Sequence, residues 1–229
     1  MKNLLARLFV VLAVACASTA RAGSIELPFQ IGGAYSVPAT SIKEARFKAM
    51  IRQQYDFSCG SAAISTLLTY HYGVAVSEQQ VFEAMFATGE QEKIKREGFS
   101  LLDMKRFLES RGFEADGFEA PLDKLASAKI PAIVLINDKG YNHFVVIKGI
   151  RDQRVLLGDP AGGTRAVSRA AFESLWVNGV LFVISNRSDV AAFNQDSDWR
   201  VAVQAPLAQG IGRAGLGGLV LPKFGTSDF

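Results

Sequence analysis

The apolar residues of this chain change their spacing near residue 130, and this change constrains the fold more than any other feature. Between residues 42 and 128 they recur at the interval of amphipathic helices, whereas residues 131–184 carry short apolar runs separated by turns. Helices first and strands second, with short turns between the strands, predict an α+β fold with a mostly antiparallel sheet.

Capping and turn residues set the limits of the expected elements. Residues 59–72 form the first expected helix, which Ser58 or Asp56 can cap and Gly73 can end. A capping-box pattern at residues 77–80 begins a second helix. The remaining expected elements are helices over residues 100–111, 122–128 and 168–176, and strands over residues 131–136, 142–149, 154–158 and 180–184.

The first 22 residues have the pattern of a secretory signal peptide. Lys2 and Arg7 precede an apolar stretch of about 10 residues, and a small-x-small cleavage pattern ends at Ala22. The apolar stretch is shorter than the roughly 20 residues of a transmembrane helix. A lipoprotein signal at Cys16 is a weaker alternative, because the aliphatic residue required three positions earlier is missing. We therefore expect cleavage after Ala22, export to the periplasm or beyond, and no stable membrane span in the product.

Removal of this leader changes the charge and the thiol content of the chain. The whole sequence has 25 basic and 22 acidic residues, and the leader holds three of the basic residues and none of the acidic ones. The product is formally neutral, which gives no support for nucleic-acid binding. One cysteine and two histidines make no zinc-binding pattern, and no dinucleotide fingerprint is present. We expect no metal, cofactor or nucleic-acid partner.

The remaining cysteine, Cys59, stands at the start of the helix expected over residues 59–72. Unpaired backbone amides and the helix dipole favour a thiolate at such a position. Gly60 follows it and leaves room for a substrate backbone to approach. The alternative is a buried and inert thiol, which is the commoner fate of a lone cysteine.

A thiol nucleophile needs a base, and the chain offers two histidines. His71 is expected about 18 Å from Cys59 along the same helix, so it cannot be the partner and is expected to be a surface or satisfied helix residue. His143 stands where a turn enters a strand, a position that can present a side chain to a cleft.

Two further side chains fit the same chemistry. Asp159 ends the strand that should pair with the His143 strand, so it can orient the imidazole, although an aspartate there is also a common turn residue. Gln53 precedes Cys59 by six residues, and its amide can stabilise an oxyanion together with the Cys59 N–H. Gln54 is the adjacent alternative.

Three sequence blocks together resemble the bacteriocin-processing double-glycine peptidase family of papain-like cysteine peptidases. They are QQYDFSCGSAA at residues 53–63, HFVV at residues 143–146 and GDPAGG at residues 158–163, and the resemblance covers residues 46–186. It implies a papain-like fold with the nucleophile at a helix N-terminus packed on the sheet. The implied roles are nucleophile for Cys59, base for His143, orienting acid for Asp159, oxyanion donor for Gln53, and substrate contacts for Gly60 and Asn142.

Two features distinguish the chain from transporter-fused members of that family. Those members have an aspartate directly before the nucleophile, where this chain has Ser58. They also continue into membrane and ATP-binding domains, whereas this sequence contains no P-loop pattern. The chain is similar instead to stand-alone exported members. The resemblance thus implies a periplasmic cysteine endopeptidase that cuts an exported protein, with double-glycine specificity left open and secretion-system components as further partners.

Three other hypotheses stay open at this point. The first is a non-cleaving, peptidase-like binding module or chaperone of an amyloid or bacteriocin export system. The second is a structural envelope protein that uses a glycine-rich C-terminal tail, expected over residues 187–229 and flexible or loosely docked. The third is acyl transfer to an amine by the same thiol. An extended entry segment over residues 23–45 completes the predicted organisation.

Overall fold

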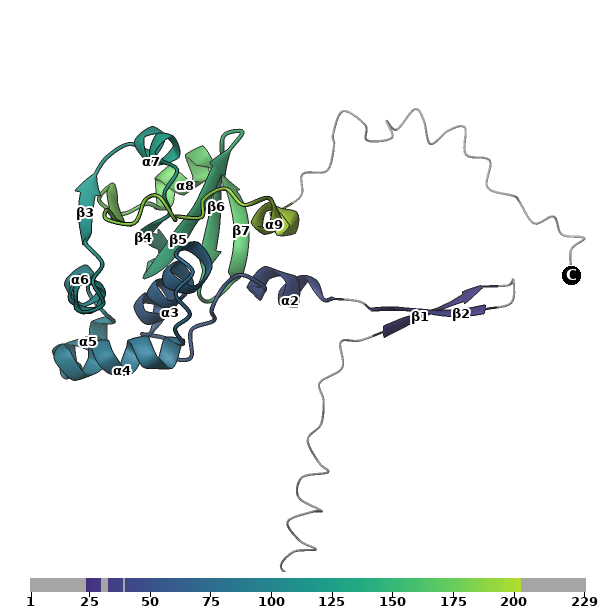
Figure 1. The fold of residues 1–229 in the computed structure, drawn as a ribbon, viewed down its shortest axis with the longest axis horizontal. Helices are drawn as coiled ribbons and strands as arrows, with labels where there is room; N and C mark the ends of the chain where they lie inside the picture. The colour runs from purple at the N-terminus through teal and green to yellow at the C-terminus, as the bar shows by residue number, and fades with distance from the viewer. Residues whose placement is uncertain (1–23, 30–32, 39, 203–229) are drawn as a thin grey trace, which may run out of the picture. The chain divides into compact units, whose positions relative to one another are not determined.

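A computed structural model of the protein describes residues 24–29, 33–38 and 40–202 (Figure 1). The chain divides into two compact units, residues 1–45 and 46–229. In the first unit, strand β1 (Ser24–Phe29) pairs antiparallel with β2 (Gly33–Pro38), where an extended segment was predicted. Helix α2 (Ile42–Phe47) crosses the division. The predicted leader, residues 1–22, lies outside the described residues.

The second unit begins with helices. They are α3 (Cys59–Thr66), which continues as a π-helical turn η1 (Leu67–His71), then α4 (Glu78–Thr88), α5 (Gln91–Glu97) and α6 (Leu101–Ser110). All of them except α5 were predicted from the sequence. Two of them start with a complete capping box, Ser77 with Gln80 on α4 and Ser100 with Asp103 on α6. The capping box predicted at residues 77–80 is therefore confirmed.

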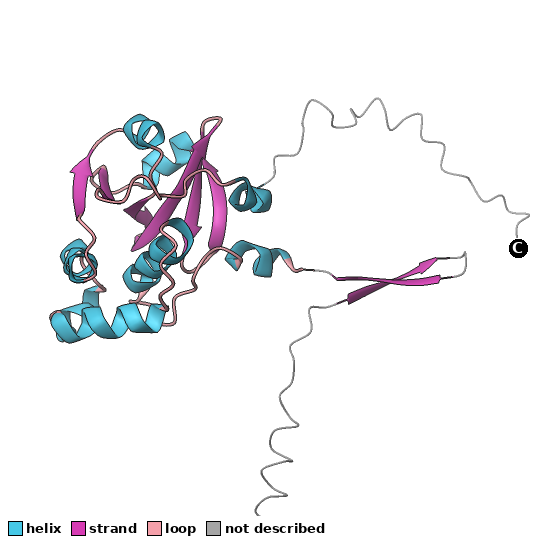
Figure 2. Ribbon diagram, viewed as in Figure 1, coloured by secondary structure: helices cyan, strands magenta, loops and turns pink. Residues whose placement is uncertain are grey.

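One six-stranded sheet follows in the order β3-β8-β4-β5-β6-β7. Figure 2 shows its strands in magenta, with helices in cyan beside them. Every neighbouring pair is antiparallel, which confirms the α+β fold predicted from the sequence. Two short helices lie between strands, α7 (Leu122–Ala128) and α8 (Arg169–Leu175). The strands are β3 (Ala115–Glu119), β4 (Ala132–Asp138), β5 (Tyr141–Arg151), β6 (Arg154–Asp159), β7 (Gly163–Ser168) and β8 (Val180–Ile184).

Strand β5 is buried on both faces because its side chains alternate between two cores. Phe144 and Val146 belong to the core that includes Cys59 and the α3 side chains. Val145 and Ile147 belong to the core on the other face, with side chains from α7 and α8. A strand held from both sides is a rigid support for a functional side chain at its start.

The packed unit runs past the boundary predicted at residue 186. Asn194 accepts a hydrogen bond from the Ile150 N–H and donates one to the Ile150 carbonyl, so its side chain extends the pairing of β5. Helix α9 (Asp196–Trp199) then brings Asp198 within 3.1 Å of the fully buried Lys148 ammonium. Because these polar contacts are partly or fully buried, residues 190–199 belong to the domain. The rest of the predicted tail, residues 203–229, lies outside the described part of the chain.

His71 is buried, whereas a surface position was one of its two predicted settings. Its Nδ1 lies 2.6 Å from the Ala192 carbonyl, so residues 190–199 cover it. Burial lowers the pKa of His71 to about 4, and the nearby Lys148 charge acts in the same direction. Within the described residues, no helix is both long and apolar enough to cross a bilayer.

Candidate active site

Helix α3 begins at Cys59, as the sequence predicted. Ser58 occupies the N-cap position, but its hydroxyl accepts from the Tyr55 N–H and donates to the Tyr55 carbonyl instead of capping α3. The serine therefore fixes the turn that leads into the helix. Since no side chain caps α3, the N–H groups of its first turn stay free to face the thiol.

The Cys59 thiol is buried, with 6% of the residue exposed. Burial raises the pKa of the Cys59 thiol, whereas the N–H groups of Phe144, Gly60 and Cys59 itself act to lower it. The charge of Asp159 adds to the increase. The helix N-terminus therefore supplies the predicted stabilising amides, but burial outweighs them, and formation of the thiolate requires a group that takes the proton.

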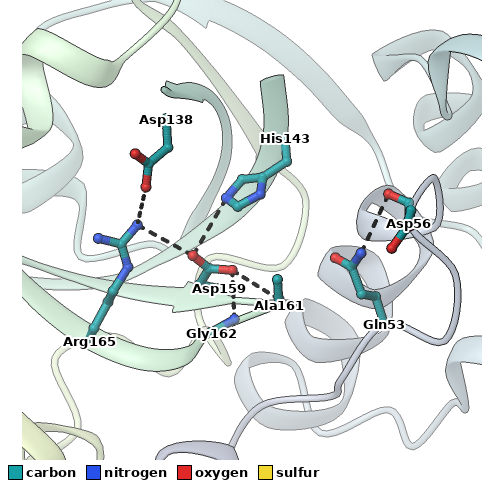
Figure 3. A network of polar contacts seen from close by, with 8 residues as sticks. All are labelled: Gln53, Asp56, Asp138, His143, Asp159, Ala161, Gly162 and Arg165. Atoms are coloured by element: carbon teal, nitrogen blue, oxygen red, sulfur yellow. Dashed lines mark hydrogen bonds and ion pairs between the residues drawn. The ribbon is translucent and has the colours of Figure 1, made fainter. Parts of the chain in front are cut away.

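His143 stands near the start of β5, directly before the residue whose amide reaches the Cys59 sulfur. Its Nε2 lies 3.5 Å from Oδ2 of Asp159, and both side chains are buried (Figure 3). This distance is at the long limit for a hydrogen bond, and such contacts commonly tighten when a substrate binds. Both ring nitrogens of His143 are buried, and neither has a hydrogen-bond partner of good geometry among the described residues. Because Nε2 faces Asp159, Nδ1 is the nitrogen left to receive the thiol proton.

Asp159 is held by partners on both carboxylate oxygens. Its Oδ1 accepts from the N–H groups of Ala161 at 2.9 Å and Gly162 at 3.1 Å, while Oδ2 faces His143 and lies 3.3 Å from Arg165. Burial acts to raise the pKa of Asp159, but the hydrogen bond and charge of His143 and the two N–H groups outweigh it and lower the pKa to about 2. The carboxylate is therefore ionised and fixed in direction.

Gln53 lies opposite His143 in the site (Figure 3). Its backbone N–H donates to the Pro160 carbonyl at 3.2 Å, which ties it to the turn after Asp159. Its Nε2 donates to the Tyr55 carbonyl at 3.0 Å and lies 3.5 Å from the Asp56 carbonyl. The amide is thus turned toward its own loop, with one N–H weakly engaged. The alternative, Gln54, is exposed.

The structure gives Gly60 and Asn142 surroundings that differ from those predicted. A Cβ added to Gly60 would lie 2.7 Å from Met104 Cε and 3.1 Å from Phe99 Cβ, so core packing already requires the glycine. Asn142 alternates onto the face of β5 opposite His143, and its Oδ1 accepts from Asn137 at 2.6 Å. The predicted substrate contacts of these two residues stay predictions.

Two residues at the site were missed from the sequence. Arg165 on β7 contacts Asp159 and lies 3.9 Å from Asp138 (Figure 3). Tyr141 precedes His143 by two positions, so it shares the same face of β5. Side chains alternate between the two faces of a strand, so the spacing of Tyr141 and His143 could have placed Tyr141 beside the site. Arg165 could not be placed in this way, because strand β7 was not predicted. No cluster of three potential metal ligands occurs within the described ranges.

Comparisons with known proteins agree with this geometry. The chain matches the Peptidase C39 family over residues 48–188, and it belongs to that family of cysteine peptidases. The "probable functional amyloid protease FapD" of Pseudomonas fluorescens is 40% identical over 164 residues, 71% of this chain and 72% of the relative. The protein of the same name from Pseudomonas aeruginosa is 41% identical over 153 residues, 67% of each chain.

A solved structure supports the same assignment of the fold. It is a double glycine motif protease from an AMS/PCAT transporter in complex with the leader peptide. The TM-score is 0.50 at 26% identity, with 59% of this chain and 89% of that chain covered. The papain-like fold and the double-glycine peptidase resemblance predicted from the sequence are therefore confirmed.

Proposed function

We propose that the protein is a thiol endopeptidase in which Cys59 attacks a peptide carbonyl. Nδ1 of His143 takes the thiol proton and later gives it to the leaving amine, and water then hydrolyses the thioester. Asp159 keeps Nε2 of His143 in place as the imidazolium forms. The observation that carries the proposal is the Phe144 amide on the Cys59 sulfur, next to a histidine backed by a fixed carboxylate.

The developing oxyanion requires donors at the carbonyl oxygen. The Cys59 N–H is one donor in this proposal, and Nε2 of Gln53 is the other. In the structure Nε2 is 3.0 Å from the Tyr55 carbonyl and 3.5 Å from the Asp56 carbonyl. Because the longer contact is weak, the N–H directed along it can be given to a substrate oxygen by a small rotation of the Gln53 side chain.

The proposed substrate is an exported protein, cut in the periplasm. The predicted leader supports the location, and the two FapD relatives, whose name describes a protease of functional amyloid, support an exported substrate. The fold shared with a leader-peptide-bound protease supports a peptide as the reacting group. Cleavage after a double glycine is the specificity that this likeness favours.

A second function is favoured by two observations at the same site. The raised pKa of the Cys59 thiol and the inward turn of Gln53 would also suit a module that binds a peptide without cutting it. Such a module would act as a chaperone or docking domain for the exported protein. Its residues would contribute affinity, and loss of the thiol would leave binding unchanged.

Terminal-peptide mass spectrometry of periplasmic proteins separates the two functions. Cells of the source strain would carry the wild-type chain, Cys59→Ala, His143→Asn or the control Ser127→Ala, which alters an exposed residue of α7. A peptidase yields new termini in wild type and control that are absent from both site variants. Termini that persist in Cys59→Ala would refute the proposed nucleophile. A partner that Cys59→Ala captures at wild-type affinity, with no new terminus in any strain, identifies the binding module.

A further inference from the structure

Tyr141 touches both halves of the proposed site. Its hydroxyl donates to the Asp56 carbonyl at 2.6 Å, across from the strand to the loop that leads into Cys59. Its ring meets the His143 ring edge-on, with centroids 5.6 Å apart and planes at 90°. One side chain therefore bridges the element that carries the base and the loop that carries the nucleophile and Gln53.

The loop of residues 53–58 depends on such ties because its middle, residues 54–56, is exposed. Gln54 and Asp56 are exposed, and Tyr55 is 52% exposed although its ring packs on Phe82 at 5.4 Å. A segment with few buried contacts is positioned mainly by its hydrogen bonds. At one end the Gln53 N–H donates a hydrogen bond to the Pro160 carbonyl. Near the other end the Tyr141 hydroxyl donates one to the Asp56 carbonyl.

The Asp56 carbonyl links Tyr141 to the oxyanion donor. This oxygen accepts the short bond from Tyr141 and also lies 3.5 Å from Nε2 of Gln53. Its position sets where the second Gln53 N–H points in the resting site. If the Tyr141 hydroxyl were absent, the Asp56 carbonyl could shift, and the loop that carries the Gln53 amide would lose a tie to the strand that carries His143.

We propose that Tyr141 is a positioning residue. It holds the 53–58 loop, and therefore the Gln53 amide, in a fixed position relative to His143. This inference rests on the proposed peptidase function. The oxyanion exists only in the transition state, so a displaced donor slows the chemical step and leaves substrate binding almost unchanged. A hydrogen bond of ordinary strength, about 1.4 kcal/mol, corresponds to a tenfold change in rate.

Tyr141→Phe removes the hydroxyl and keeps the ring, so it tests the link directly. With a fluorogenic peptide that spans the cleavage site mapped by mass spectrometry, we expect kcat to fall about 10-fold and KM to stay within about twofold. In a Gln53→Ala background, Tyr141→Phe should have almost no further effect, because the donor that it positions is gone. Tyr70→Phe, which changes an exposed tyrosine on η1, is the matched control and should leave both constants unchanged.

Hydrogen–deuterium exchange gives a second readout that does not require turnover. Peptides that cover residues 53–58 should exchange faster in Tyr141→Phe and at the wild-type rate in Tyr70→Phe. Unchanged exchange, an unchanged kcat, or a loss of equal size in the Gln53→Ala background would each overturn the role of Tyr141 while the peptidase function stands. A wild-type protein whose turnover does not depend on Cys59 would instead overturn the proposed function, and the catalytic part of this inference with it.

Discussion

Replacement of Asp159 by asparagine should remove the contribution of the ionised carboxylate to the free energy of unfolding. The pH dependence of that contribution should disappear with it. Asp159 is 4% exposed as a residue. Its carboxylate accepts from the Ala161 and Gly162 N–H groups and from the Arg165 guanidinium, and it lies 3.5 Å from the His143 ring. These partners favour the ionised form, so the folded protein binds a proton here less readily than the unfolded chain. Asparagine keeps an oxygen for the N–H groups but has no charge to titrate.

The size of the effect follows from the two pKa values. In the folded protein the pKa of Asp159 is about 2, against an ordinary 3.8. At pH 6 this difference stabilises the fold by about 2.4 kcal/mol, because each tenfold change in proton affinity corresponds to about 1.4 kcal/mol. A depressed pKa gives stability that is present above the unfolded value and lost as the pH falls. The contribution is about 1.3 kcal/mol at pH 3 and about 0.4 kcal/mol at pH 2.

Urea unfolding between pH 2 and pH 6 measures this contribution. The free energy of unfolding of the wild type should exceed that of Asp159→Asn by a gap that narrows by about 2 kcal/mol as the pH falls from 6 to 2. His71, whose pKa is lowered to about 4, is present in the wild type and in the variant, so its titration cancels from the gap. Asp189→Asn, at an exposed carboxylate, should follow the wild type throughout. A gap that stays constant with pH would refute the claim that the folded site holds an ionised Asp159.

Two other predictions concern charged residues that the structure places in or near the core. Lys148→Met leaves the Asp198 carboxylate without its buried partner, so the free energy of unfolding should fall by about 3–5 kcal/mol. The double variant Lys148→Met with Asp198→Leu has no unpaired charge and should recover most of that loss. Urea unfolding measures both values. A double variant as unstable as the single one would contradict this. Arg165→Gln removes a positive charge 3.3 Å from Asp159. The site becomes more negative, which disfavours the Cys59 thiolate, so the acidic limb of the pH–activity profile should move to higher pH. Arg165→Lys should move it less, and a profile that stays in place in Arg165→Gln would show that the charge has no influence on the site.

The residues that could be placed from sequence are those whose position depends on local structure. Cys59 follows a turn and starts a helix, His143 follows a turn and starts a strand, and Asp159 ends a strand at a proline and two glycines. Element ends are marked by capping and turn residues, so they can be located in one sequence. The helix–strand order likewise gave the antiparallel sheet without any knowledge of its register.

The parts that could not be predicted depend on register or on weak local signals. Strand β7 alternates too little for recognition, and without it Arg165 has no place beside Asp159. Strand β3 has a single buried residue, and α5 has only Ile94 buried, so neither shows a clear apolar period. The sequence around Asn194 indicates only a polar segment, although its side chain accepts a hydrogen bond from the Ile150 N–H of β5 in the structure.

Strand β5 explains how these separate features form one site. Its first residues carry Tyr141 and His143, which face the loop before Cys59 and the carboxylate at the end of β6. Its later residues carry Lys148, whose ammonium donates to the Ala49 carbonyl at 2.7 Å and pairs with Asp198. Burial lowers the pKa of Lys148, so the pairing with Asp198 is what keeps a charged strand residue compatible with the core. Residues 190–199, which sequence composition assigned to a tail, are therefore part of the support that fixes the strand on which His143 stands.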